Sequence, residues 1–136
     1  MYAYKRGDYQ LCLQLSTQNV LTLLYGSYWI NVAVLPEFFQ LLDDDIVSLT
    51  ALTLIVNPEC RCNIASCCIS QLTLSLYLMT LCQLKLRHSV TSLAQTLNYV
   101  NVAQRRTPVA RTLDRLTLKL SERMMLRNLS NRLNSA

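Results

Sequence analysis

Residues that break helices are scarce in this chain, and their scarcity limits the folds open to it. The 136 residues include two glycines and three prolines, and neither type occurs between Pro58 and Pro108. An all-β fold of this length needs many turns, which are built from Gly, Pro, Asn and Asp. The sequence therefore predicts an all-α fold. A hydrophobic content of 51% is enough for one sizeable core, so we expect residues 1–136 to form a single helical domain.

Local patterns place helices along most of the chain. Pro36 and Pro108 suit the first turn of a helix, Ser89 and Thr107 are predicted N-caps, and Asn57-Pro58 is a stop. Two loops are predicted between the helices. Residues 26–35 form an aromatic, β-branched loop of extended character, and residues 59–68 form a cysteine-rich loop. With a short helix before Gly7, the predicted helices span 8–25, 36–42, 43–56, 69–86, 90–106 and 108–133.

The segment 69–86 carries a mixed signal. Its leucines alternate with Thr73, Ser75 and Tyr77, which is typical of a strand. The run is several times longer than a usual strand and contains no turn residue, so a helix is predicted. Most of the segment lies in an uncharged stretch, 63–84, which is long enough to span a bilayer. Polar residues are scattered around every face of it, which favours a buried central helix over a membrane span.

The distribution of charge bears on the partner of this chain, and its cysteines and first residues bear on its cellular compartment. The net charge is +5, and ten of the 13 Lys and Arg residues lie at Lys85 or beyond it. Such a basic region fits an acidic or phosphate-bearing partner, or simply a solvated face. The chain starts with polar residues rather than the apolar run of a signal peptide. We therefore expect a cytoplasmic protein in which the six cysteines are reduced.

The stretch YKRGDYQLC, residues 4–12, predicts the bend of a helical hairpin. Gly7 is expected to end a first helix, because only Gly enters the left-handed cap region cheaply. Asp8 is expected to cap the next helix with its carboxylate. Since few residues precede the bend, we expect this chain to be the C-terminal piece of a larger protein.

This stretch resembles the middle of a tetratricopeptide repeat, in which a tyrosine ends the first helix, a Gly-Asp-Tyr bend follows, and a small residue lets the second helix pack closely. Ser16 and Asn19 depart from that pattern, and in a second, weaker match over 77–97 Arg87 replaces the glycine. The resemblance implies helical hairpins in a bundle or short solenoid that serves as a protein-interaction scaffold. The positions that match are Tyr4, Gly7, Asp8, Tyr9 and Cys12.

A second resemblance covers residues 40–60 and 69–120. They are similar to the helical C-terminal tail of invertebrate male-abnormal-type, cyclic GMP-AMP synthase-like, nucleotidyltransferase proteins. This resemblance implies an alternative function as the helical fragment of such a protein. The magnesium-binding pattern of that enzyme class is only partly present, as Gly26-Ser27 and the run 43–45. Asp44 would place a charge where a strand buries an apolar residue, so the three aspartates are instead expected in the first turn of a helix.

No cofactor, metal or catalytic residue is predicted. The cluster CRCNIASCC, residues 60–68, spaces its thiols as C-x-C and C-C, whereas zinc sites usually use C-x2-C pairs. His88, the only histidine, lies in another bend and is expected to be a capping or surface residue. The chain is therefore not expected to be an enzyme.

A basic stripe on the last helix is the clearest candidate site. Leu113, Leu116, Leu120 and Met124 are expected to mark the apolar side of the same helix. The stripe is interpreted either as a contact face for an acidic partner, nucleic acid or anionic lipid, or as a solvated face that Asp114 and Glu122 partly balance. Its lack of aromatic residues argues against single-stranded nucleic acid. The stripe consists of Arg111, Arg115, Lys119, Arg123 and Arg127, at successive i+4 steps.

Together these observations predict a non-catalytic helical scaffold or protein-interaction module that binds a protein partner. An acidic surface on that partner is one of the alternatives left open. Nucleic acid and membrane are the less favoured partners, and a membrane-associated helical protein is the last alternative.

Overall fold

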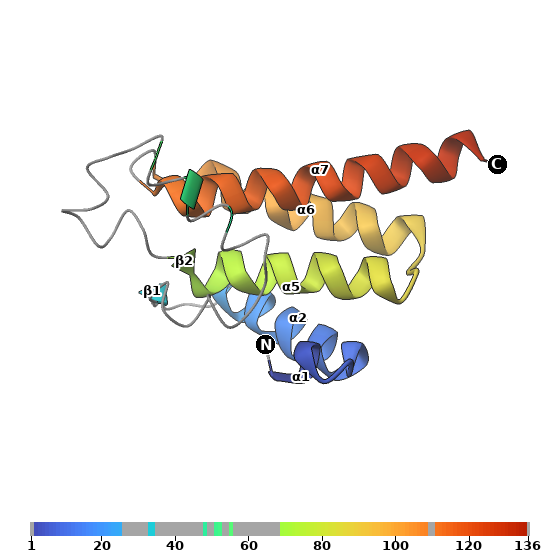
Figure 1. Cartoon of the computed structure of the whole chain (residues 1–136), viewed down its shortest axis with the longest axis horizontal. Coiled ribbons are helices and arrows are strands. Elements are labelled where there is room, and N and C mark those ends of the chain that lie inside the picture. The colour runs from blue at the N-terminus through green and yellow to red at the C-terminus, as the bar shows by residue number, and fades with distance from the viewer. Residues whose placement is uncertain are drawn as a thin grey trace.

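The computed structural model describes residues 2–25, 33–34, 48, 51–52, 55, 69–108 and 111–135. Within these ranges the chain consists of helices packed against one another and one short strand pair (Figure 1), which confirms the all-α prediction. The elements are α1 (Tyr2–Lys5), α2 (Tyr9–Tyr25), β1 (Ala33–Val34), β2 (Ile69–Ser70), α5 (Gln71–Lys85), α6 (Val90–Arg106) and α7 (Thr112–Asn134).

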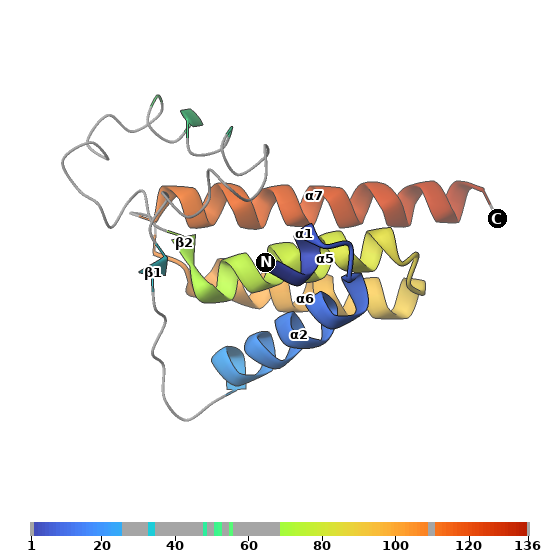
Figure 2. The ribbon, with the colours of Figure 1, turned by 60° about the horizontal axis from the view of Figure 1, so that its bottom comes forward.

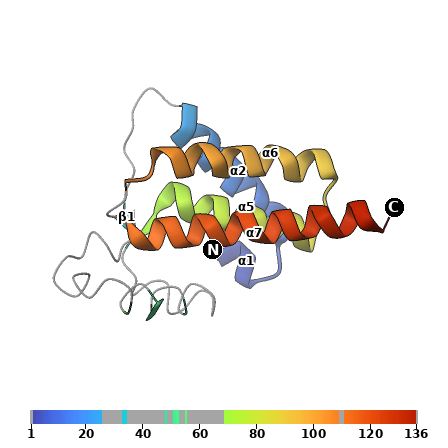
Figure 3. The same cartoon turned by 90° about the horizontal axis from the view of Figure 1, so that it is seen from above.

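Helix α5 is the centre of the structure. It packs against α2, α6 and α7, and α2 and α7 lie on opposite sides of it in Figures 1 and 2. Helices α6 and α7 run side by side, and the C-terminal end of α7 extends past α6 (Figure 3). Because neighbours surround α5, eleven of its 15 residues are buried. This confirms the buried central helix and explains the mixed pattern, since both the leucines and the residues between them face protein.

Buried polar residues of α5, among them Thr80 and Gln83, have hydrogen-bond partners in the core. The Thr80 hydroxyl donates to the Leu76 carbonyl at 2.9 Å. The Thr96 hydroxyl of α6 donates to Gln83 Oε1 at 2.6 Å. These bonds let a helix with threonine and glutamine on its faces occupy the core, because a buried polar group is costly only when it is unpaired.

The bend between α1 and α2 has the geometry expected from its glycine. Gly7 has a φ of +78°, its N–H donates to the Tyr4 carbonyl at 3.0 Å, and the Asp8 N–H donates to the Ala3 carbonyl at 2.9 Å. This pair of bonds is a Schellman motif. Asp8 Oδ1 then accepts from the Leu11 N–H at 3.2 Å, so the aspartate caps α2 as predicted.

The bend between α5 and α6 repeats this motif without a glycine. Arg87 has a φ of +53°, its N–H donates to Leu84 at 3.3 Å, and the His88 N–H donates to Gln83 at 3.1 Å. Ser89 caps α6, as predicted, by accepting from the Ser92 N–H. Arg87 therefore holds a left-handed conformation, which costs an L-amino acid free energy.

Two predicted helix starts are wrong. Helix α5 begins at Gln71 rather than residue 69, because Ile69 and Ser70 pair antiparallel with β1 and the Ser70 hydroxyl caps the helix. Helix α7 begins at Thr112 rather than Pro108. Thr107 does not cap α7, because its hydroxyl donates back to the Ala103 carbonyl at 2.8 Å at the end of α6.

Other predictions fall on parts of the chain that the structure describes only in part. Ala33 and Val34 are extended, as expected for the loop 26–35. Of the predicted helix 43–56, Ser48, Ala51–Leu52 and Ile55 are described and are helical. The predicted helix 36–42 and the loop 59–68 lie outside the described residues. Among the described helices, none is both long and apolar enough to cross a membrane.

Candidate interaction face

Helix α7 presents four of the five predicted stripe residues to solvent. Arg115, Lys119, Arg123 and Arg127 are exposed, and a rise of about 1.5 Å per residue spreads them over about 18 Å of helix. They are exposed because the opposite face of α7 is buried against α5 and α6. We refer to these four residues as the basic stripe. The buried residues of α7 are Leu113, Asp114, Thr117, Leu118, Ser121 and Met125.

The buried face of α7 differs from the predicted apolar side. Leu113 is fully buried, but Leu116, Leu120 and Met124 are only half-buried. Leu120 and Met124 pack against a small core cluster that contains Ile69, Tyr77, Leu81 and Leu113. The centre of the buried face is instead partly polar. Thr117 and Ser121 can occupy it because their hydroxyls donate to carbonyls one turn earlier, at 2.8 and 3.0 Å.

Arg111 does not belong to the basic stripe. It is the residue before the first turn of α7, and its side chain is three-quarters buried. Its Nε donates to Asp114 Oδ2 at 2.9 Å. The prediction placed Arg111 one step along the same helical face, and it fails because the helix starts after this residue and the guanidinium folds back onto an acid.

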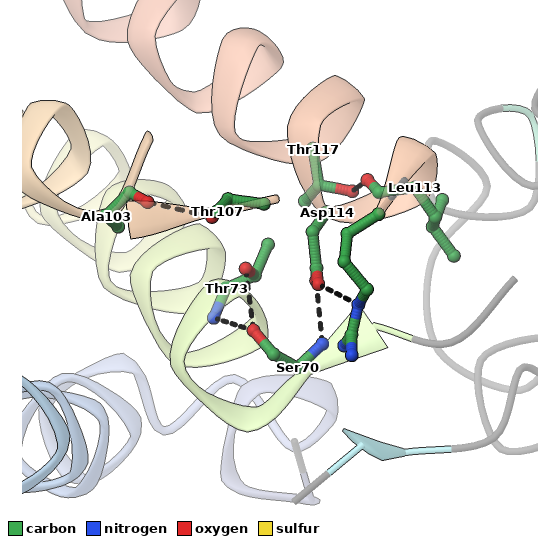
Figure 4. A network of polar contacts seen from close by, with 8 residues as sticks. Ser70, Thr73, Ala103, Thr107, Leu113, Asp114 and Thr117 are labelled. Atoms are coloured by element: carbon green, nitrogen blue, oxygen red, sulfur yellow. Dashed lines mark hydrogen bonds and ion pairs between the residues drawn. The ribbon is translucent and has the colours of Figure 1, made fainter. Parts of the chain in front are cut away.

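Asp114 ties the start of α7 to the start of α5. Its Oδ1 accepts from the Ser70 N–H at 2.7 Å while its Oδ2 binds Arg111. The Ser70 hydroxyl in turn bonds to Thr73 at 2.8 Å, and Figure 4 shows the Asp114 side chain of α7 pointing toward Ser70 at the start of α5. Sequence reasoning missed this network. The available signal was the position of Asp114, three residues after Arg111 and next to Leu113, which faces the core.

The two acidic residues of α7 leave the basic stripe without ionic partners. Asp114 is engaged with Arg111, and Glu122 accepts a hydrogen bond from Gln104 of α6 at 2.9 Å. Arg111 and Asp114 form an ion pair at 2.9 Å, and none of the described acidic residues forms an ion pair with a residue of the basic stripe. Both carboxylates of α7 therefore bond to groups outside the basic stripe.

A shallow hollow of about 140 Å³ lies at the start of the basic stripe, between α6 and α7. Gln104, Arg115 and Lys119 line it. A carboxylate placed there would meet the cations Arg115 and Lys119, beside an amide that already donates to Glu122. The hollow thus gives the basic stripe one defined point of contact.

The described part of the chain brings together no metal site. No group of three or more His, Cys, Asp or Glu side chains lies close enough to hold an ion there. The candidates Gly26-Ser27, the aspartates 43–45 and the cysteines of 60–68 lie outside the described residues. His88 is half-buried in the bend after α5, and its carbonyl accepts a hydrogen bond from the Arg132 guanidinium of α7.

The two described cysteines are free thiols in the core between α2 and α5. Burial, and then the hydrogen bond with Cys12, raise the pKa of Cys82 to about 12. A thiol with this pKa stays protonated near neutral pH, whereas the thiolate is the reactive form. Cys82 is therefore suited to packing and not to nucleophilic chemistry.

No protein-family model matches this sequence, and no curated protein or solved structure is significantly similar to it. The tetratricopeptide and nucleotidyltransferase-tail resemblances therefore stay predictions.

Proposed function

We propose that this chain is a non-catalytic helical interaction module that binds an acidic protein segment through the basic stripe of α7. The observation that carries the proposal is that four exposed cations lie in one line without an acidic partner among the described residues. Isolated surface ion pairs contribute little, but several cations in register can bind one multivalent ligand.

The spacing of the basic stripe specifies the ligand. Neighbouring members of the stripe are four residues apart, or about 6 Å along the helix. Acidic residues at every fourth position of a partner helix repeat over the same distance, and the hollow beside Arg115 and Lys119 receives the first of them. A helix with carboxylates at i, i+4, i+8 and i+12 is the simplest matching ligand. Helix α7 has no aromatic residue for base stacking, which favours protein over single-stranded nucleic acid.

The hairpin arrangement supports the scaffold part of the proposal. The bends at Gly7 and Arg87 use the same pair of hydrogen bonds, and α2 of the first hairpin packs on α5 of the second. A tetratricopeptide-like relation between the two hairpins is part of this proposal. A cytoplasmic location is also part of it, supported by the free, buried thiols Cys12 and Cys82, since reduced cysteines are typical of that compartment.

The test compares two variants with the same net charge. The stripe variant changes Arg115, Lys119 and Arg123 to Gln. The control changes three exposed cations that lie elsewhere, two arginines and one lysine as in the stripe variant, and they are Lys5, Arg87 and Arg105. Binding to a synthetic helical peptide with Glu at every fourth position is measured by fluorescence anisotropy at several salt concentrations. A Gln version of the peptide serves as the ligand control.

We expect the stripe variant to lose at least about tenfold in affinity at low salt, and the control variant to lose much less, because only the stripe variant removes cations in contact with the ligand. Equal losses would show that net charge alone attracts the peptide. Tighter binding to an RNA oligonucleotide or to anionic vesicles than to the peptide would contradict the assignment of a protein partner. Circular dichroism should show both variants folded, since the changed side chains are exposed.

A further inference from the structure

The outer face of α2 combines large apolar side chains with an absence of charge. Leu11, Leu15, Leu21 and Tyr25 are 43%, 49%, 40% and 65% exposed. No charged residue lies between Asp8 and Glu37, so the whole of α2 is uncharged. The outer face of a solvent-exposed helix normally carries charged residues. This face therefore has the composition of an interface.

A groove lies beside these side chains, along the seam between α2 and α5. It has a volume of about 360 Å³ and is lined by Leu15, Gln18 and Asn19 of α2 together with Leu74 and Leu78 of α5. None of the described residues that line it is charged. Leu15 belongs both to the exposed apolar row and to the groove, so projecting apolar groups and a recess that can receive them share one surface.

We infer that this surface is a self-association site, on which the α2 face of a second copy of the chain docks about a two-fold axis. A two-fold contact brings the same patch of both copies together, so it requires a self-complementary surface. Here the exposed leucines of one copy can enter the groove of the other, and the reverse contact forms at the same time. An unrelated partner would not require both features on one face.

Charge favours a second copy on this face over the other long helices. Each copy carries a net charge of +5. Among α2, α5, α6 and α7, only α2 has no Lys or Arg. Two copies that meet through α6 or α7 would bring like charges together, which costs free energy, whereas two α2 faces meet without repulsion.

The size of the surface sets the strength of the contact. Helix α2 has 17 residues, or about 25 Å of length. A contact confined to one helix and its groove lies at the low end of specific interfaces, which bury about 1,200–2,000 Å². The dimer is therefore weak and depends on concentration. Because α7 lies across α5 from α2 (Figures 1 and 2), both basic stripes stay accessible in it.

Sedimentation equilibrium of the full chain, from about 1 μM to 1 mM, tests this inference over the range of weak affinities. We expect a monomer–dimer equilibrium that tightens as salt rises, because salt screens the repulsion between two basic copies. Leu15→Glu should weaken association at least about tenfold by placing a charge in the contact. The matched control is Leu126→Glu, because Leu126 is 47% exposed on α7, and it should leave the dissociation constant unchanged.

A monomer at every concentration would overturn the inference, and so would equal effects of the two variants or assembly beyond the dimer. Circular dichroism of Leu15→Glu checks its folding. If that variant unfolds, Leu11→Glu replaces it, since Leu11 lies on the same exposed row and does not line the groove. The result is independent of the proposed function, because acidic-peptide binding weakens with salt whereas dimerisation strengthens.

Discussion

Replacing Gly7 with alanine isolates the cost of a left-handed backbone in the bend between α1 and α2. Gly7 has a φ of +78°, and a Cβ atom built on it would meet nothing within 4 Å. The methyl group therefore adds no clash and removes no packing. What remains is the left-handed conformation of an L-residue, which costs about 1–2 kcal/mol. The smaller conformational freedom of alanine in the unfolded chain offsets about 0.4–1 kcal/mol of this.

We expect Gly7→Ala to lower the free energy of unfolding by about 1 kcal/mol. For a chain of this size, that loss lowers the urea midpoint by about 0.5 M and the melting temperature by about 3–5 °C. Far-ultraviolet circular dichroism during a urea titration measures the midpoint. An unchanged or higher midpoint would refute the reasoning, because alanine stabilises a helix at any ordinary right-handed position.

The bend at Arg87 provides the reverse experiment. Its φ of +53° already places a side chain in the left-handed region. Arg87 is exposed, and its backbone bond to Leu84 does not depend on the side chain. We expect Arg87→Gly to raise the free energy of unfolding by up to about 1 kcal/mol. Destabilisation by Arg87→Gly would mean that the arginine makes contacts that outweigh the strain of its backbone.

Three further predictions concern the buried polar groups. Asp114→Ala leaves the Ser70 N–H without its acceptor, and we expect a urea titration to show a loss of about 2–4 kcal/mol; a loss near zero would mean that the network does not stabilise the fold. Thr96→Val keeps the shape of the side chain but removes the donor to Gln83, and should cost about 1–2 kcal/mol in the same assay. Because burial raises the pKa of Cys82 to about 12, the unfolded chain releases this proton first as pH rises above 9. The wild-type chain should therefore lose up to about 1.4 kcal/mol more per pH unit than Cys82→Ala between pH 9 and 12, and parallel curves would contradict the raised pKa.

Signals carried by neighbouring residues predicted the fold well. The scarcity of Gly and Pro indicated helices, and the order Gly7-Asp8 indicated a bend and a cap, because these effects act within one helical turn. Thr107 shows a case that local sequence does not decide. Its hydroxyl could cap the following helix or bond back to the preceding one, and both options have the same local sequence. The structure uses the second, and α7 consequently starts later.

The candidate site was harder to predict because it depends on contacts between distant segments. The i+4 spacing correctly put Arg115, Lys119, Arg123 and Arg127 on one exposed face. Arg111 has the same spacing, yet it is drawn inward by Asp114, whose other oxygen binds Ser70, 44 residues earlier in the chain. No periodic pattern contains that information. The groove beside α2 was missed for the same reason, because its second wall comes from α5.

The position of α5 connects the two proposed surfaces. A helix buried on several sides needs neighbours on opposite faces, so α2 and α7 are held apart and exposed in different directions (Figure 1). One of them is uncharged and the other carries the basic stripe, and salt should therefore act on them with opposite sign. At low salt the chain should bind an acidic ligand most strongly and self-associate least. A dimer carries two basic stripes and would bind a ligand with two acidic segments more tightly than the monomer does, provided that the segments can span both stripes. The affinities of the one-segment and two-segment peptides are compared for the wild type and for Leu15→Glu. If Leu15→Glu binds the one-segment peptide normally but loses the extra affinity for the two-segment peptide, that extra affinity depends on contact through α2.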